Sequence, residues 1–184
     1  SDFNNKYTNN YSKHEYIKYN DNINNFVDFK ACYKSIKKHI IDCNINYDVD
    51  TYIHMWYQNE ELKQEIIRLY NPKKYMFEDN KKIILEINEK CKLLGDTKGK
   101  RKGYLSRLYS LCNSLKLLDN DINYDLVIFY RPDVLLWKNM DFNFYDRNCI
   151  TTNGRGFGDF HFVMSMKNSF LFSNFYDIID TYLL

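Results

Sequence analysis

The sequence predicts an α/β protein with three layers, in which a mostly parallel sheet is flanked by helices. Two observations lead to this prediction. Short runs rich in β-branched and aromatic residues alternate with helical patterns of about 10 to 15 residues, an order that builds parallel sheets through right-handed crossovers. The segment YDLVIFY (124–130) is a nearly continuous apolar run, typical of a strand that helices cover on both faces. No internal repeat is visible.

The composition fits one globular domain. Of the 184 residues, 45% are apolar and 27% are charged, with only 2 Pro and 6 Gly, so the chain is neither disordered nor dominated by loops. A chain of this length buries roughly 70% of its unfolded surface on folding. Residues 1–25 are polar and rich in Asn, which predicts a loosely attached arm before a single domain over 26–184. That domain could be one module of a longer protein.

Charge and cysteine usage exclude several classes of protein. The formal net charge of +2 is too small for a protein that coats nucleic acid, so no nucleic-acid partner is expected. No run of 18 apolar residues occurs, and the first thirty residues do not resemble a signal peptide. The five cysteines show no spacing typical of zinc sites or disulfide frameworks, which favours reduced thiols in a cytoplasmic setting. They are Cys32, Cys43, Cys91, Cys112 and Cys149.

The first half of the chain alternates helix and strand. Apolar residues at helical spacing predict a helix over 29–41, and the β-branched and aromatic run at 47–56 predicts a buried strand. A second helix is expected over 60–70, where Asn71-Pro72 ends it. The segment 74–77 follows as a short strand.

The second half repeats the alternation around one clear loop. Helical patterns at 81–94 and 105–118 lie on either side of the loop GDTKGKRKG (95–103), in which Gly95 is a plausible C-terminal cap. The central strand 124–130 comes next. The remaining expected elements are a strand at 148–151, a glycine-rich turn at 152–159, a strand at 160–164 and a closing helix from Lys167.

The strongest candidate site is Arg131-Pro132-Asp133, directly after the most apolar strand. In parallel sheets, ligands bind beyond the carboxyl ends of the strands. Pro132 restricts the backbone of its neighbours, so Arg131 and Asp133 should keep a defined relation. Asp133 could ligate Mg²⁺ or Mn²⁺, which prefer carboxylate oxygens and share their coordination with substrate phosphates. The alternative is an Arg–Asp ion pair that only closes the strand end.

Basic residues in and beside the loop at 95–103 are candidates for binding phosphate. Lys98, Lys100, Arg101 and Lys102 lie in or beside the loop, and Arg107 follows one turn into the next helix. A cationic side chain aimed at a departing diphosphate can stabilise a transition state by several kcal/mol. Solvated surface charge is the alternative for each of them.

The glycine-rich turn offers a second carboxylate. The glycines of GRGFG (154–158) allow close approach of a sugar, Arg155 lies among them, and Asp159 follows. Asp159 could bind sugar hydroxyls or act as the general base that deprotonates an acceptor hydroxyl, or it could be an ordinary turn residue. His161 lies two residues on and shares a strand face with Asp159. His161 is a candidate metal or phosphate ligand, with a structural histidine as the alternative.

The first strand could contribute a pocket wall. Tyr52, His54 and Trp56 share one face of the strand at 47–56 and could line a sugar or nucleotide pocket, although core packing is favoured for Trp56. Asp48 and Asp50 precede the strand body, at the edge away from the expected site, and are interpreted as solvated. No Ser/His/Asp or Cys/His arrangement and no P-loop is found, so hydrolase and NTPase functions are excluded.

The order of several motifs resembles a known family. DVDTYIHMW, LYNPK, LSRLYSLCNSLKLL, YDLVIFYRPDVLLW and GFGDFHFVMS follow one another over about residues 47–170. This order is similar to that of bacterial and giant-virus glycosyltransferase-like proteins of the GT-A fold, a fold related to the Rossmann type, whose central strand has the form YDxVIRxRxD. The resemblance implies a nucleotide-diphosphate sugar donor, a glycan or other hydroxyl acceptor, and Mn²⁺ or Mg²⁺ held by Asp133. A viral chain would then work in the host cytoplasm.

Two hypotheses of function follow from these motifs. The first is a metal-assisted glycosyltransferase, with Asp159 as the catalytic residue, Asp133 and His161 as metal ligands, and a set of basic residues together with His54 as the donor-binding residues. The second is a non-catalytic carbohydrate- or partner-binding module on the same fold, because the strand and glycine- and arginine-containing turn that open such folds are not found before Phe29. The oligomeric state is not predicted. The donor-binding candidates are Arg131, Arg107, Lys100, Arg101, Arg155 and His54.

Overall fold

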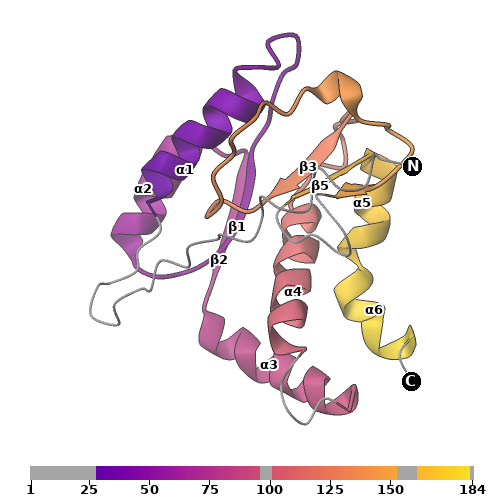
Figure 1. Ribbon diagram of the computed structural model, residues 1–184. Coiled ribbons are helices and arrows are strands. Elements are labelled where there is room, and N and C mark those ends of the chain that lie inside the picture. The colour runs from indigo at the N-terminus through magenta and orange to yellow at the C-terminus, as the bar shows by residue number, and fades with distance from the viewer. Residues whose placement is uncertain (1–27, 96–100, 153–160, 183–184) are drawn as a thin grey trace, which may run out of the picture.

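The computed structural model describes residues 28–95, 101–152 and 161–182, which form a mixed fold of helices and two small sheets (Figure 1). The expectation of an α/β protein is confirmed at this level. The elements, in chain order, are α1 (Phe29–Ile36), the π-helical turn η1 (Lys37–Ile41), β1 (Tyr52–Trp56), α2 (Glu60–Tyr70), β2 (Lys74–Glu78), α3 (Asn80–Leu93), α4 (Lys102–Lys116), β3 (Val127–Tyr130), the 3₁₀ turn η2 (Phe142–Phe144), β4 (Thr151–Thr152), β5 (His161–Met164), α5 (Met166–Ser173) and α6 (Phe175–Tyr182).

Local sequence signals set the ends of the first two helices. The Asp28 carboxylate accepts hydrogen bonds from the backbone of Lys30 and Ala31, both at 3.0 Å, and so begins α1. The Asn59 side chain accepts from the Leu62 backbone at 2.8 Å and begins α2. That helix ends at Asn71, which takes a left-handed conformation with φ of 42°. The predicted limits of the helix over 60–70 are therefore confirmed.

The first sheet is parallel, as expected. β1 and β2 pair in register from Tyr52 opposite Lys74 to Trp56 opposite Glu78. The eleven residues of α2 connect them as the crossover that a parallel pair requires. Because of this register, Glu78 lies beside the carboxyl end of β1.

The second sheet corrects the expectation of a mostly parallel sheet. β5 lies between β3 and β4 and runs antiparallel to both, with Val127 opposite Met164 and Tyr130 opposite His161. Residues 131–152 contain only the short turn η2 as helix, so this part of the chain provides no helical crossover of the kind a parallel partner requires. Antiparallel pairing needs no such crossover.

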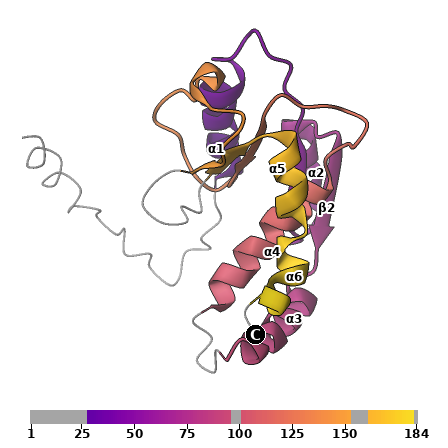
Figure 2. The same ribbon diagram turned by 90° about the vertical axis from the view of Figure 1, so that its right-hand side faces the viewer.

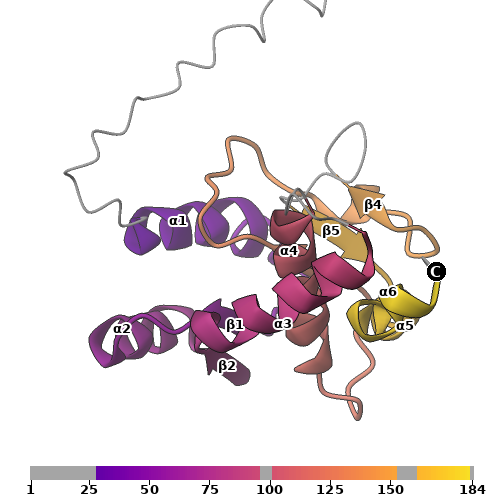
Figure 3. The ribbon, with the colours of Figure 1, turned by 90° about the horizontal axis from the view of Figure 1, so that it is seen from below.

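Helix α4 is the shared support of both sheets (Figures 2 and 3). It contacts β1 and β3, and on its other sides α3, α5 and α6. One hydrophobic cluster joins α3, α4 and α6 around Ile87, Cys112 and Ile179. A second cluster joins α4 to the sheet of β3 and β5 through Leu111, Leu115, Phe162 and others. The helix therefore connects the parallel and the antiparallel sheet.

A third cluster fixes the long segment after β3 against η1. Ile40, Met140, Phe142 and Val163 form its buried part. Asn44 is buried beside them, and its amide donates to the carbonyl oxygens of Ile40 at 2.6 Å and Met140 at 2.8 Å. The Phe142 backbone N–H donates to the Asn44 side chain at 3.0 Å. This single polar residue closes the turn after η1 and holds the segment from Met140 to Phe142.

All five cysteines are free, and Cys32, Cys91 and Cys112 are buried. In the part of the chain that the structure describes, no helix combines the length and the apolar character needed to cross a bilayer.

Candidate functional site

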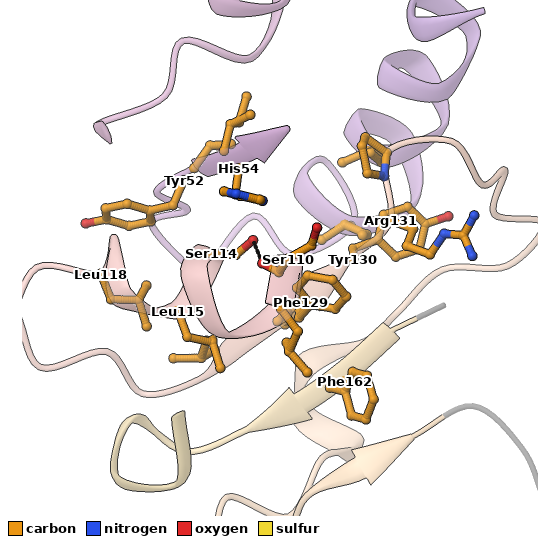
Figure 4. A pocket seen from close by; sticks show the side chains of 18 of the residues that line it. Tyr52, His54, Ser110, Ser114, Leu115, Leu118, Phe129, Tyr130, Arg131 and Phe162 are labelled. Atoms are coloured by element: carbon orange, nitrogen blue, oxygen red, sulfur yellow. Dashed lines mark hydrogen bonds between the residues drawn. The ribbon is translucent and has the colours of Figure 1, made fainter. Parts of the chain in front are cut away.

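A cavity of about 1560 Å³ lies between β1 and β3 (Figure 4). Residues of both strands line it along their whole length. Helix α4 forms one wall, where the Ser114 hydroxyl donates to the Ser110 carbonyl at 2.7 Å, and α1 contributes apolar side chains from the other side. The candidate residues at the carboxyl end of β3 lie at the rim of this cavity.

Arg131 and Asp133 form a two-point ion pair at this rim. Arg131 Nε donates to Asp133 Oδ1 at 3.0 Å, and Arg131 Nη2 donates to Asp133 Oδ2 at 2.6 Å. The two side chains are 32% and 34% exposed, so a ligand in solvent can reach both. The tight turn after β3 holds them, because the Tyr130 hydroxyl donates to the Val134 carbonyl at 2.7 Å. The pairing expected as the alternative to a ligand site is therefore present, and it lies on the cavity.

The Asp133 charge acts on two neighbouring acidic groups. Burial, aided by the carboxylates of Asp133 and Asp28, raises the pKa of the Cys32 thiol on α1. Burial, together with Cys32 and Asp133, raises the pKa of Tyr130 to about 12. Both groups are therefore neutral at physiological pH. Asp133 and the Arg131 guanidinium carry the formal charges of this part of the rim.

A partly buried polar network that the sequence did not reveal lies beside β1. His54 Nε2 and Glu78 Oε2 are 2.6 Å apart, and the Tyr109 hydroxyl donates to both Glu78 oxygens, at 2.9 and 3.1 Å. Burial lowers the pKa of His54 although Glu78 opposes the shift. Burial and the nearby Glu78 carboxylate raise the pKa of Tyr109. In the sequence, the signal that could have indicated this network is Glu78, which ends the aromatic strand KYMFE.

Aromatic side chains complete the wall around His54. The rings of Trp56 and Tyr109 are stacked, with centroids 5.8 Å apart and planes 13° apart, and His54 meets both rings edge to face. Trp56 packs against the cluster of α3, α4 and α6, which confirms the core position favoured for it. Trp56 and His54 also line the cavity.

A second polar group lies at the opposite end of the cavity and corrects one interpretation. Asp50, expected to be solvated, accepts a hydrogen bond from the Tyr124 hydroxyl at 2.6 Å and pairs with Lys73 at 2.5 Å. Tyr124 in turn lies 2.7 Å from the Tyr52 hydroxyl. Burial favours the neutral form of Asp50, but Lys73 and Tyr124 outweigh it and hold the pKa of Asp50 below its usual value. Asp48 is exposed, as expected.

The basic candidates in and beside the loop at 95–103 lie in different places in the structure. Arg107 lies on α4, lines the cavity and donates from Nε to the Gly103 carbonyl at 3.1 Å. Arg101 donates from Nη1 to the Leu94 carbonyl at 3.1 Å, so it joins the end of α3 to the start of α4. Lys98 and Lys100 lie outside the described residues. Of the described candidates Arg101, Lys102 and Arg107, it is Arg107 that lines the cavity.

His161 takes the first position of β5, opposite Tyr130. Burial lowers the pKa of His161, which favours the neutral ring. The described residues that line the cavity include its neighbour Phe162 but not His161 itself. The glycine-rich turn with Arg155 and Asp159 lies outside the described residues, so the structure does not test the second carboxylate.

A divalent cation at the rim of the cavity would have one carboxylate ligand there, Asp133, which now pairs with Arg131. Within 28–95, 101–152 and 161–182, no group of three or more His, Cys, Asp or Glu side chains could hold a metal ion. A Mg²⁺ or Mn²⁺ ion, however, is often held by one or two carboxylates, with substrate phosphates and water completing its coordination. Asp133 is an accessible carboxylate of this kind, and it would hold such an ion in place of Arg131.

No family model matches the chain, and the searches of curated proteins and of solved structures return no match.

Proposed function

We propose that the protein is a glycosyltransferase that moves a sugar from a nucleotide-diphosphate donor to a hydroxyl acceptor on a three-layer, GT-A-like fold. The observation that carries the proposal is the Arg131–Asp133 pair, which lies directly after β3 at the rim of the cavity. A guanidinium that solvent can reach can bind a diphosphate, and a neighbouring carboxylate can bind the metal ion that accompanies it.

Each residue of the pair has a role that its chemistry supports. The Arg131 guanidinium can bind a phosphate through two parallel hydrogen bonds, the same geometry in which it now binds Asp133. Glycosyl transfer leaves negative charge on the departing diphosphate, and fixed positive charge stabilises it. Asp133 would hold Mn²⁺ or Mg²⁺, which when bound supplies further charge for the same phosphates.

The other candidate residues support the proposal unequally. Arg107 lies on the cavity wall and would bind the donor, while Lys100, Arg101 and Arg155 remain proposed phosphate contacts. His54 engages Glu78 through Nε2, so its proposed part is to shape the donor pocket. Asp159 remains the proposed general base, and a cytoplasmic location is proposed with it. His161 remains a proposed ligand of the metal.

A binding titration tests the proposal. We expect UDP, GDP or one of their sugar conjugates to raise the melting temperature in the presence of Mn²⁺, because a ligand present at 100 times its Kd adds about 2.7 kcal/mol. Asp133→Asn should remove the Mn²⁺-dependent part of the shift. Asp177→Asn, which changes an exposed carboxylate on α6, should retain it. The proposal fails if no nucleotide shifts the wild-type protein.

A non-catalytic carbohydrate-binding module is the second candidate function. One observation favours it: Arg131 and Asp133 occupy each other's hydrogen-bonding groups, so the rim is neutral without any ligand. A neutral rim would bind sugar hydroxyls rather than a diphosphate. Glycan-array binding that persists in EDTA, together with no measurable donor hydrolysis, would favour this module over the transferase.

A further inference from the structure

The end of the cavity away from Arg131 carries a second set of polar side chains, to which the proposed donor makes no contact. The Tyr124 hydroxyl donates to Asp50 Oδ2 at 2.6 Å and lies 2.7 Å from the Tyr52 hydroxyl. All three side chains belong to residues that line the cavity. Figure 4 shows Tyr52 on the side of the cavity opposite Arg131. Asp50, Tyr52 and Tyr124 are called the tyrosine–aspartate cluster below.

The hydrogen bonds of this cluster run in one direction. A tyrosine hydroxyl carries a single proton. Because Tyr124 donates its proton to Asp50, the bond between the two tyrosines is donated by Tyr52. Burial and the neighbouring Asp50 carboxylate raise the pKa of Tyr124, so that its hydroxyl stays protonated. The Tyr52 oxygen therefore keeps the capacity to accept a further hydrogen bond.

Asp50 offers a second acceptor. Its two close partners, Tyr124 and Lys73, both contact Oδ2, at 2.6 and 2.5 Å. The other oxygen, Oδ1, accepts no hydrogen bond from the described residues and is not one of their buried, unpaired atoms, so it keeps contact with solvent. A ligand in the cavity can therefore donate to Asp50 without breaking either of its present contacts.

The charges at this end favour a neutral ligand. Lys73 neutralises Asp50 and disfavours a metal ion there. Asp48, which is exposed and also lines the cavity, adds a negative charge that would repel a phosphate or another anion. The two open acceptors, Asp50 Oδ1 and the Tyr52 oxygen, match the O–H donors of a sugar.

The length of the cavity indicates the size of this ligand. Tyr124 and Arg131 lie on either side of β3, whose four residues alone extend over roughly 13 Å. This separation is longer than a single sugar ring. The cavity volume of about 1560 Å³ also exceeds the roughly 300–1,000 Å³ of pockets that hold one small molecule. A donor at the Arg131 end therefore leaves room for a second, extended ligand.

We propose that the tyrosine–aspartate cluster is the distal acceptor subsite of the transferase and binds one unit of a neutral oligosaccharide. The reacting hydroxyl of that oligosaccharide lies towards Arg131, and the subsite holds a sugar unit further along the same chain. The acceptor is then an oligosaccharide, not a single sugar or a small alcohol. This inference rests on the proposed function, because it assigns the second substrate of that reaction.

Binding to arrayed neutral oligosaccharides, from single sugars to hexasaccharides, tests this inference without any donor. We expect the full chain to bind the longer members more tightly than single sugars. Asp50→Asn should weaken this binding at least about tenfold: Lys73 and Tyr124 both donate, so the amide turns its oxygen to them and places an N–H group where Oδ1 now accepts. Asp119→Asn is the matched control and should bind normally, because Asp119 pairs with Lys74, is similarly exposed and lies outside the lining.

A second variant keeps the test decisive if Asp50→Asn does not fold. Tyr52→Phe retains the ring and removes the other acceptor, so it should also weaken the binding of long oligosaccharides while single sugars change little. No binding by the wild-type protein, equal binding of single sugars and hexasaccharides, or equal effects of Asp50→Asn and Asp119→Asn would overturn the inference.

The nucleotide titration described above distinguishes a failure of this inference from a failure of the proposed function. If UDP or GDP with Mn²⁺ raises the melting temperature but no oligosaccharide binds, the subsite is wrong and the donor site stands. If oligosaccharides bind with the expected dependence on Asp50 but no nucleotide binds, the transferase is wrong. The cluster is then a subsite of the carbohydrate-binding module.

Discussion

Arg131 binds Asp133, which lies two positions further along the chain, through two nitrogen atoms, so that each charge is neutralised at the mouth of the cavity. A pair that is about one-third exposed contributes little to folding because water screens it. The pairing of these two charges therefore matters more for ligand binding than for stability. The two properties can be measured separately.

Asp133→Asn separates them. We expect transferase turnover to fall at least about 100-fold, since a lost charge aimed at the reacting diphosphate costs several kcal/mol, while stability to urea changes by less than about 1 kcal/mol. Donor turnover and urea unfolding are measured on the same preparation. Unchanged turnover with an intact fold would remove Asp133 from the site, and Asp177→Asn serves as the matched control on α6.

We expect the protein to lose stability as the pH is lowered, because His54 takes up a proton on unfolding. Burial lowers the pKa of His54 in the folded state, so the unfolded chain binds a proton that the folded chain does not. The free energy of unfolding then decreases as pH falls below about 6.5 towards the lower, folded-state pKa. His54→Gln should reduce the loss measured by urea unfolding between pH 7.5 and 5.5. Burial also lowers the pKa of His161, so part of the pH dependence should remain in this variant.

The same experiment has a clear contrary result. If His54→Gln keeps the full pH slope, the proton is taken up elsewhere. The double change of His54 and His161 to Gln should flatten the profile in this window, because both folded-state pKa values lie below the unfolded one.

The core of α3 can be tested on one helix with two leucine-sized residues. Ile87 is fully buried between α3, α4 and α6, whereas Leu85 is 68% exposed. Ile87→Ala should lower the free energy of unfolding by about 2–5 kcal/mol, through lost burial and the cavity left behind. Leu85→Ala should change it by less than about 0.5 kcal/mol. Equal effects in urea unfolding would contradict the orientation of α3.

Asn44 should be as costly to lose as a large apolar residue. Its side chain satisfies the carbonyls of Ile40 and Met140 and the Phe142 amide, and truncation leaves these buried groups unpaired. We expect Asn44→Ala to destabilise the protein by about 3 kcal/mol, against almost no effect from Asn46→Ala at an exposed position. Thermal melts of the two variants check this, and coinciding melts would refute the role of Asn44.

Local features of the fold were predictable, and pairings between distant segments were not. The helix over 60–70 was predicted with its correct limits because Asn59 and Asn71-Pro72 are signals within the segment itself. The expectation of a mostly parallel sheet does not hold for β5, because strand pairing depends on the long segment between Tyr130 and His161, and no sequence pattern in that segment sets the direction of the strand.

The candidate site divides in the same way. The Arg131–Asp133 pair spans two residues, so a local pattern sufficed to propose it. The contact of Glu78 with Tyr109 joins residues 31 positions apart, and it depends on how α4 packs against the first sheet. Asp50 was assigned to solvent for the same reason, since Tyr124, its partner, is 74 positions away.

The position of α4 has a consequence for how the protein folds. In the described part of the chain the two sheets share no hydrogen-bonded strand, and α4 contacts both. Neither sheet can be fully packed until this helix has docked, although four other elements, α2, β2, α3 and α4, lie between β1 and β3 in the described chain. The transition state should therefore contain α4, so that substitutions at Leu108 or Leu111 slow refolding while those at the surface of α2 mainly hasten unfolding. We expect this helix to be the nucleus around which the two sheets become one cooperative unit.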